Sequence, residues 1–531
     1  MKLRVSVAIA ALVASRVSIG QPDNAPAGRW WSHMQVLAND ELEGRLTGTQ
    51  GHRKAVEYAA KQLERAGLKR SGTDGYFQPV QFIRLEIVER GSKLELVRDG
   101  KATPLDFADD AFLYPVPDLA STLEAPLMFV GHGLTILEKG IEDLKGLDLK
   151  GKVAVSLAGA PVSLPGPLGA YAQSIAERWK ALKKAGALGV VRILNPDNMD
   201  IPWPRLANSR TEPDFTLADP SLNETAGLQL AVVVNPAQAE KWFADSGHTF
   251  AEIIAAARQD KPLPKFEMAG KLRVATRQSS QAVTSDNVVA VLPGSDPRLK
   301  DEYVVVSAHI DHLGLGSPVD GDRIYNGAFD NASGCSTVLE TAATLAHGRE
   351  RPRRSIVFLL PTGEEQGTLL LGSKYFVNRP TVPVEAIVAD VNIDNLVALF
   401  PLKSLIAIGM DESDLGNDVR AVGAKLGLEI LPDPQPKRVL FIRSDQYSFV
   451  RRGIPAVWPR VGFRAGSPEE VMYKKWLTER YHAPSDDLQQ PINRQTAEDF
   501  NRAFAALVLQ IANRDRRPAW NESSFFRRFV K

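Results

Sequence analysis

The segment Tyr303-Val-Val-Val-Ser-Ala-His-Ile-Asp-His312 joins an apolar, β-branched run to a polar end. Such a run predicts a short buried strand. In open α/β sheets, ligands bind outside the carboxyl ends of the strands. We therefore expect His309 and Asp311 to lie at the carboxyl edge of a sheet, where a functional site can form.

Two later runs end in acidic residues in the same way. Ile356–Leu360 leads into Pro-Thr-Gly-Glu-Glu365, and Ala389–Ile393 leads into Asp394. Ser333–Leu345, between the first two runs, has a helical pattern of apolar residues. The alternation of strand, helix and strand predicts an α/β fold with parallel strands.

A turn and a late loop supply further polar groups. Asp330 lies in Asn326–Gly334, which opens the helix that follows, and His482 lies in Tyr481–Asp487. Each motif alone has an ordinary structural explanation. Asp-Asn-Ala-Ser-Gly is typical of a helix N-cap, and a Glu-Glu pair is typical of a solvated surface. Only the combination indicates a site.

Together these residues can bind two divalent cations. Zinc is bound by imidazole nitrogens and carboxylate oxygens, and the candidate ligands are His309, Asp330, Glu365, Asp394 and His482. Their three carboxylates balance three of the four positive charges of two zinc ions, and one bridging hydroxide balances the fourth. Asp330 is the natural bridge, because its two oxygens can hold ions roughly 3.5–4 Å apart.

Glu364 remains beside a candidate ligand. Neighbouring residues on an extended backbone project to opposite sides, so Glu365 can reach a metal while Glu364 faces the cleft. Glu364 is then the candidate general base, which takes a proton from water and passes it to the leaving amine. We expect Asp311 to accept a hydrogen bond from the far nitrogen of His309 and to fix its tautomer.

The composition excludes several classes of protein. The 531 residues are 44% apolar and 24% charged, which suits two to four folded domains and excludes wholesale disorder. With 64 Lys+Arg and 63 Asp+Glu, the net charge is +1, so no electrostatic footprint for nucleic acid exists. Cys335 is the single cysteine. An intrachain disulfide and a thiolate metal cluster are therefore excluded, and we expect a small buried thiol.

The first residues resemble a processing signal. Lys2 and Arg4 precede the apolar run Val5–Ser15, which is shorter than the ~20 residues that cross a bilayer as a helix. We predict a signal peptide over residues 1–20 and export to the periplasm or the extracellular space. The alternatives are an N-terminal core strand and a surface anchor. No later run reaches the spanning length, so we expect no membrane span.

Composition shifts near Pro115–Pro126 and Arg277–Ser285 suggest that the catalytic domain is split. The predicted division is a signal peptide at 1–20, the N-terminal part of the catalytic domain at 21–115, an inserted domain at 116–280 and the main part of the catalytic domain at 281–531.

The motifs, taken in chain order, resemble metallopeptidase family twenty-eight, the secreted dizinc aminopeptidases related to bacterial leucyl aminopeptidase and the glutamate carboxypeptidases. The matching segments are Ser307–His312, Gly327–Gly334, Gly363–Glu365, Asn392–Asp394 and Tyr481–Asp487. Leu37–Arg45 and Gly48–Gly51 are similar to the N-terminal segment of these enzymes. Gly131–Gly133, Leu147–Lys152 and Lys183–Ala187 look like the protease-associated domain inserted in many of them.

The resemblance implies an α/β fold of the zinc aminopeptidase type: a three-layer sandwich with a mostly parallel mixed sheet, plus a smaller β-rich inserted domain. It implies that one zinc is bound by His309, Asp330 and Asp394, and the other by Asp330, Glu365 and His482. It also gives Glu364 the role of general base and makes Asp311 the residue that orients His309. Tyr481 corresponds in some members to a hydroxyl that stabilises the tetrahedral intermediate; the alternative is a packed aromatic ring.

Three segments depart from the family pattern or lie outside it. Gln446 stands where His is frequent, which removes no ligand. Asp197–Asp214 matches no family segment, and we expect a loop over the cleft. The end of the chain carries Phe525, Phe526 and Phe529 among basic residues. We expect this tail to dock on the body of the protein, with membrane contact as the alternative.

The leading functional hypothesis is an aminopeptidase with two Zn²⁺ ions, acting on peptides with a free N-terminus. A carboxypeptidase or amidohydrolase is the second hypothesis, and it needs a basic pocket, for which Arg443, Arg460 and Arg464 are candidates. The related glutaminyl cyclases use one zinc, which the five-ligand set argues against. A non-catalytic binding protein, as the transferrin receptor is, should have lost ligands or the base, and here every expected position is filled.

Overall fold

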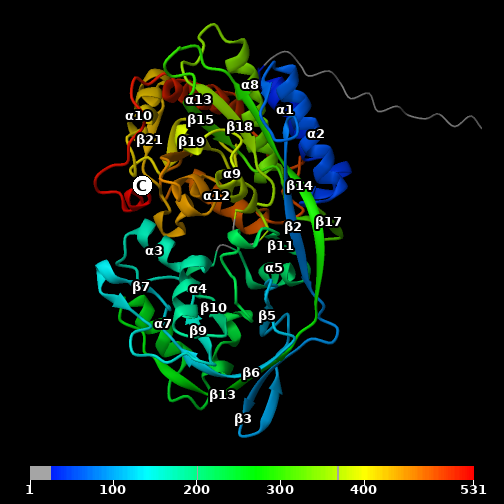
Figure 1. The fold of residues 1–531 in the computed structure, drawn as a ribbon, viewed down its shortest axis with the longest axis vertical. Helices are drawn as coiled ribbons and strands as arrows, with labels where there is room; N and C mark the ends of the chain where they lie inside the picture. Colours follow the sequence, from blue (N-terminus) through cyan, green and yellow to red (C-terminus); the bar gives the residue numbers. More distant parts are fainter. Residues whose placement is uncertain (1–25, 200, 367–369, 531) are drawn as a thin grey trace, which may run out of the picture.

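The computed structural model describes residues 26–199, 201–366 and 370–530. The predicted signal peptide lies outside these residues. Figure 1 shows two parts. One contains the beginning of the described chain (blue) and its C-terminal half (yellow to red), and the other contains most of the middle of the chain (cyan and green).

The first part is built on a ten-stranded sheet. Its strands are β1 (Lys69–Arg70), β2 (Phe77–Ile87), β11 (Asp214–Leu217), β14 (Gln278–Leu292), β15 (Tyr303–Ser307), β18 (Ser355–Leu360), β19 (Ile387–Asn392), β20 (Ser404–Ile408), β21 (Glu429–Leu431) and β22 (Ala456–Val461). The order is β11-β2-β14-β18-β15-β19-β22-β20-β21, with β1 beside β14.

The predicted α/β class and mixed sheet are confirmed, and the parallel part is central. β15 pairs in parallel with β18 and β19, and β19 pairs in parallel with β22. On the flanks, β14 pairs antiparallel with both β18 and β2, and β20 pairs antiparallel with β22. The sheet is therefore parallel at its centre, where the site residues emerge, and largely antiparallel outside it.

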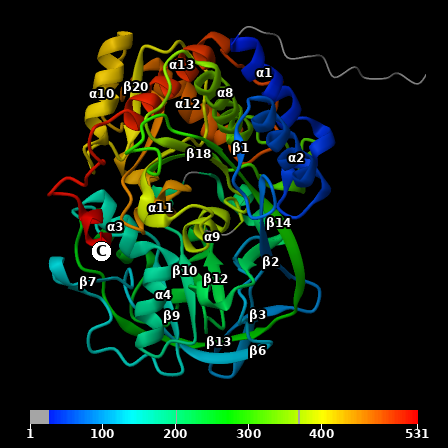
Figure 2. The same cartoon turned by 45° about the horizontal axis from the view of Figure 1, so that its top comes forward.

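Helices cover both faces of this sheet. The helices of this part of the molecule are α1 (Pro26–Leu37), α2 (Gln50–Arg65), α8 (Ser333–His347), α9 (Leu371–Asn378), α10 (Leu415–Leu426), α11 (Gln446–Val450), α12 (Pro468–Glu479) and α13 (Arg494–Ala512). Figure 2 shows α8 and α13 on one side of β18, and α9 and α11 on the other.

The alternation of side chains along β15 explains these three layers. Val304 and Val306 pack in the core with α8 and α13, whereas Val305 packs in a separate core with α9 and α11. Successive residues of a strand point to opposite faces. An uninterrupted valine run is therefore what a strand needs when helices bury both of its faces.

The second part contains an eight-stranded sheet. Its strands are β3 (Lys93–Arg98), β4 (Lys101–Pro104), β5 (Ala111–Leu113), β6 (Thr122–Phe129), β9 (Val153–Leu157), β10 (Gly189–Ile193), β12 (Ala231–Val234) and β13 (Phe266–Ala275). Its helices are α3 (Gly166–Gln173), α4 (Ile175–Lys184), α5 (Trp203–Asn208), α6 (Glu240–Phe243) and α7 (Phe250–Arg258).

Two short hairpins lie outside both large sheets: β7 (Thr135–Ile136) pairs with β8 (Ile141–Glu142), and β16 (Gly314–Val319) pairs with β17 (Asp322–Tyr325).

The second sheet begins ahead of the boundary predicted at residue 116. Strands β3, β4 and β5, over residues 93–113, pair in this sheet rather than in the first. Conversely, β11 lies within the predicted insert but pairs with β2 of the first sheet. The chain thus returns once to the first sheet before the second sheet is complete.

The C-terminal tail docks on the body, as predicted. Phe526 is fully buried and packs on Phe441 and Trp520. Phe525 and Phe529 flank Tyr171 of α3, with ring centroids 5.2 and 5.6 Å apart. The tail therefore joins the two parts of the molecule through aromatic contacts. None of the helices described here combines the length and the apolar character that a membrane crossing requires.

Candidate metal centre

The polar residues predicted from the strand ends converge at the carboxyl edge of the first sheet. His309 follows β15, Glu364 and Glu365 follow β18, and Asp394 follows β19. Asp330 lies in the turn before α8. His482 lies in the loop after α12 and joins them from the late part of the chain.

One cluster gathers around the imidazole of His309. Its Nε2 lies 3.4 Å from Asp330 Oδ1 and 3.4 Å from Asp394 Oδ1. His309 is 1% exposed, so these groups face each other away from bulk water. The three donor atoms form one of the groups that are compact enough to hold an ion.

The second cluster gathers around His482. Its Nε2 lies 3.3 Å from Asp330 Oδ2 and 3.2 Å from Glu365 Oε2. Asp330 therefore directs one oxygen to each imidazole, which is the arrangement expected of a bridging carboxylate. His312 lies on the same side, with Nδ1 2.6 Å from Glu365 Oε1. It also groups with Asp330 and Glu365 as a possible donor set.

The separations fit metal ligands better than hydrogen bonds. Two ligands of a tetrahedral zinc, each about 2.0–2.1 Å from the ion, lie about 3.3–3.4 Å apart. Charge-assisted hydrogen bonds between nitrogen and oxygen are shorter, about 2.7–2.9 Å. His482 Nε2 is buried and has no hydrogen bond with adequate geometry in the part of the chain that the structure describes. The donor set therefore fits zinc in both type and spacing.

The electrostatics of the cluster favour a bound cation. Burial disfavours the imidazolium of His482, but Glu365 and Asp330 outweigh burial and raise its pKa to about 10. Burial also disfavours the imidazolium of His309, but the carboxylates of Glu364, Asp394 and Asp330 outweigh burial and raise its pKa well above the ordinary value. Without a cation, protons would occupy the space between the carboxylates. Metal binding must therefore release protons.

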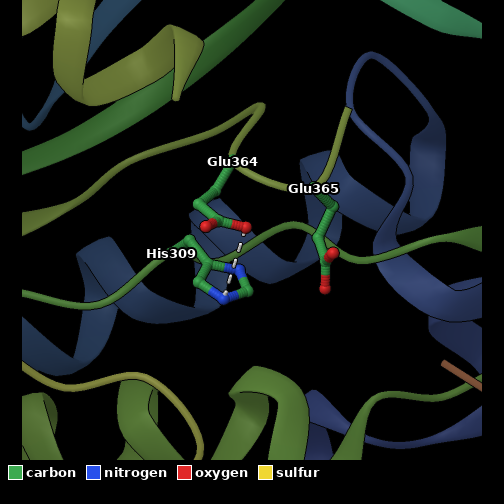
Figure 3. A group of neighbouring side chains, drawn as sticks. All are labelled: His309, Glu364 and Glu365. Atoms are coloured by element: carbon green, nitrogen blue, oxygen red, sulfur yellow. Dashed lines mark ion pairs between the residues drawn. The ribbon is translucent and has the colours of Figure 1, made fainter. Parts of the chain in front are cut away.

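Glu364 is placed differently from Glu365. Figure 3 shows its carboxylate facing the imidazole of His309, while Glu365 lies to one side. Glu364 Oε2 is 3.9 Å from His309 Nε2. Burial, followed by the negative charges of Asp394 and Glu365, raises the pKa of Glu364 well above its usual value. A carboxylate so destabilised has a strong tendency to accept a proton.

The contact predicted for Asp311 differs from the one observed. His309 Nδ1 lies 3.2 Å from the main-chain oxygen of Asp311, not from its carboxylate. The carboxylate instead accepts hydrogen bonds from the main-chain amides of Glu364 and Glu365, both at 3.2 Å. These amides follow the end of β18 and have no strand partner, and buried amides need an acceptor. Asp311 therefore positions the loop of the candidate base as well as His309.

Tyr481 and Gln446 lie beside the centre. The ring of Tyr481 stacks on His482, with centroids 4.0 Å apart, and burial raises the pKa of its hydroxyl well above the usual value. Gln446 accepts a 2.6 Å hydrogen bond from Asn392 and donates to two main-chain oxygens. It supports the end of β19 and takes no part in either cluster.

Three buried residues of the site were missed from the sequence. Asp486 accepts hydrogen bonds from the main-chain amides of Phe329 and Asp330, both at 3.0 Å, so the loop of His482 also holds the bridging residue. Asp445 is fully buried near Glu364, and burial raises its pKa to about 7. Asp486 lies inside the motif Tyr481–Asp487 and Asp445 lies next to Gln446, but only the folded structure reveals what the two acids contact. The third residue is Arg45.

Arg45 is 1% exposed and donates hydrogen bonds to main-chain oxygens only. It reaches Ile310 at 3.0 Å, Asn326 at 2.6 Å and Gly327 at 3.1 Å, and it also contacts the oxygen of Leu37. Its guanidinium thus ties the segment after β15 to the turn that carries Asp330.

Arg45→Met is expected to destabilise the fold by about 3–5 kcal/mol, because it leaves buried oxygens without donors. Thermal unfolding of the purified variant measures this as a lower Tm. Arg53→Met on α2 is the control, since Arg53 is half exposed and pairs with Glu57 and Asp286. Such surface pairs contribute about 0–1 kcal/mol. Equal and small changes in both variants would contradict a supporting role for Arg45.

Comparison with known proteins supports the fold. Residues 287–508 match the model of peptidase family M28. A stretch of 115 residues is 30% identical to Leupeptin-inactivating enzyme 1 of Streptomyces exfoliatus, covering 22% of this chain and 23% of that protein. A second stretch, of 113 residues, is 36% identical to a probable zinc metalloprotease of Pyrenophora teres f. teres (strain 0-1). It covers 21% of this chain and 23% of that protein. The aligned stretch thus spans about a quarter of these relatives.

The fold similarity extends further than the sequence similarity. An aminopeptidase from Aneurinibacillus sp. strain AM-1 superposes with a TM-score of 0.56 at 20% identity, covering 91% of this chain and 93% of that one. The matched residues 287–508 contain all five candidate ligands and Glu364. This region of the chain is therefore similar to peptidase family M28.

Proposed function

We propose that the chain is a zinc-dependent aminopeptidase that binds two zinc ions and releases N-terminal residues from peptides. The observation that carries the proposal is the convergence of His309, Asp330, Asp394, Glu365 and His482 at ligand separations, with Glu364 beside them. One zinc would be held by His309, Asp330 and Asp394, and the other by Asp330, Glu365 and His482.

Bound zinc supplies a Lewis acid that lowers the pKa of water and polarises a carbonyl oxygen. Glu364 would accept the proton of the attacking water and give it to the leaving amine. Asp311 holds Glu364 in place by accepting the hydrogen bonds of the loop amides. Tyr481 keeps its proton, so its hydroxyl could donate to the oxygen that develops negative charge.

The arginines suggested for a carboxypeptidase do not favour that alternative. Arg460 donates to Tyr473 at 2.8 Å, and Arg464 pairs with Glu429. Arg443 lies near Tyr481, where its charge works against the effect of burial on the pKa of the hydroxyl. Two of the three candidates are thus engaged in contacts outside the metal centre, which leaves release of N-terminal residues as the better-supported reaction. The predicted signal peptide adds the proposal that the enzyme acts outside the cytoplasm.

A matched set of substrates tests the proposed specificity. Zinc-loaded protein is expected to hydrolyse an unblocked aminoacyl-arylamide and a peptide with a free N-terminus. It should leave the N-acetylated peptide intact, even when the C-terminus of that peptide is free. Release of C-terminal residues from the acetylated peptide would instead favour the carboxypeptidase, and cleavage within it would contradict an exopeptidase.

A further inference from the structure

The helix α5 lies in the segment Asp197–Asp214, which matches no family pattern, and it is anchored on the second part of the molecule. Figure 1 shows α5 at the boundary between the two parts. Trp203 donates a 2.9 Å hydrogen bond to the main-chain oxygen of Ala108, and its ring packs on Phe112 of β5, with centroids 5.6 Å apart. These contacts hold α5 against the second sheet, so Arg205 extends from a fixed position.

Arg205 reaches from α5 to the loop that carries His482. Its guanidinium donates a 3.0 Å hydrogen bond to the main-chain oxygen of Tyr481 and a second hydrogen bond to that of Thr478. Thr478 lies in the last turn of α12, where main-chain oxygens have no partner within the helix. Among the residues that the structure describes, no main-chain amide donates to either oxygen. Arg205 therefore supplies the hydrogen bonds that these two oxygens do not receive from the main chain.

The oxygen of Tyr481 belongs to the peptide group that leads into His482. The orientation of this peptide group sets the φ angle of His482, which is +54°. Non-glycine residues rarely adopt this left-handed conformation, and it persists where surrounding contacts fix it. In this conformation His482 Nε2 lies 3.3 Å from Asp330 Oδ2 and 3.2 Å from Glu365 Oε2. By holding the peptide oxygen, Arg205 fixes the backbone from which the imidazole reaches these carboxylates.

We propose that Arg205 is a positioning residue for the zinc site of His482, Asp330 and Glu365. It holds the peptide group before His482 in the orientation that aims the imidazole at the site, and it supplies no ligand itself. The inference rests on the proposed zinc centre and extends it, because it makes α5, on the second part of the molecule, a determinant of zinc affinity. Outer partners that orient metal ligands typically contribute about ten- to hundredfold to metal affinity.

Zinc titration of the metal-free full chain, measured by calorimetry, tests this role. Arg205→Met removes the donors and keeps an apolar stem. We expect it to weaken zinc binding at the His482 site by about ten- to hundredfold and to leave the affinity of the His309 site unchanged. Arg210→Met is the matched control, because Arg210 lies in the same segment, is mostly buried and pairs with Glu89 at 2.8 Å. It should bind both ions as the wild type does.

Two further variants guard against a general loss of structure. Arg205→Gln is shorter and presents a single NH₂ group, so it should weaken the same site even if Arg205→Met does not fold. Arg205→Lys should recover part of the affinity, because its ammonium can donate to the same oxygens. Thermal unfolding of each variant shows that the protein titrated with zinc is folded.

A double-mutant cycle determines whether Arg205 acts through His482. His482→Ala removes the ligand that Arg205 is proposed to position. Adding Arg205→Met to His482→Ala should therefore cause no further change in zinc binding. A further loss in the double variant would show that Arg205 acts elsewhere and would overturn the proposal.

Wild-type zinc affinity in folded Arg205→Met or Arg205→Gln would also overturn the role of Arg205, as would an equal loss at both zinc sites. These outcomes are separate from the proposed activity. Zinc affinity that depends on Arg205, in a protein that hydrolyses no peptide, would support this inference while the peptidase proposal failed. Peptide hydrolysis with zinc affinity independent of Arg205 would do the reverse.

Discussion

Glu364→Gln is expected to lower kcat by about 10³- to 10⁴-fold while both zinc ions remain bound. The amide has nearly the same shape as the carboxylate but cannot accept a proton. Glu364 lies 3.9 Å from His309 Nε2 and contributes no oxygen to the ligand set proposed above. Its removal should therefore stop proton transfer without emptying the site.

Metal analysis and kinetics on the same preparation check this result. Glu57→Gln is the control, because it makes the same chemical change on the exposed side of α2, where Glu57 pairs with Arg53. Turnover near the wild-type rate in Glu364→Gln would remove Glu364 from the mechanism. Loss of zinc along with activity would instead assign it to the ligands.

Asp330→Asn is expected to reduce the affinity for both zinc ions and to abolish turnover. Among the residues that the structure describes, Asp330 is the one carboxylate that lies within 3.4 Å of both imidazoles, through Oδ1 to His309 and Oδ2 to His482. The carboxamide presents one oxygen and one NH₂ group, and the NH₂ group cannot serve as the second ligand. The bridge, and with it the pairing of the ions, should be lost.

Asp394→Asn supplies the matched comparison, because Asp394 contacts the His309 cluster alone. It should weaken one zinc site and leave the other, so the bound metal should fall by half under conditions that saturate the wild type. Metal content measured after dialysis gives the answer for each variant. The same metal content in both variants would contradict a bridging role for Asp330.

The apolar pattern predicted the central elements well, because burial alone determines them. The valine run of β15 and the helix opened by Ser333 appear where they were expected. The tail with Phe526 docks as predicted. The antiparallel flanks of the sheet could not be derived in the same way, because pairing direction depends on distant segments such as β2 and β14.

The positions of His309, Glu365 and Asp394 followed from one rule, that parallel strands present their carboxyl ends at a common edge. Asp330 and His482 were outside that rule, because they lie in a turn and a late loop, and the combination of motifs suggested them as ligands. The partner of Asp311 was predicted wrongly in detail, since sequence proximity favoured His309 and the unpaired amides after β18 were not visible. The segment Leu37–Arg45 was marked by the resemblance, but the contacts of Arg45 reach across the fold and no local pattern showed them.

Zinc titration of metal-free protein, followed by bound metal and by arylamide hydrolysis, tests the central claim most directly. We predict that chelation abolishes activity and that activity returns as two zinc ions bind per chain. Full hydrolysis by protein from which all metal has been removed, or recovery without bound zinc, would contradict the account.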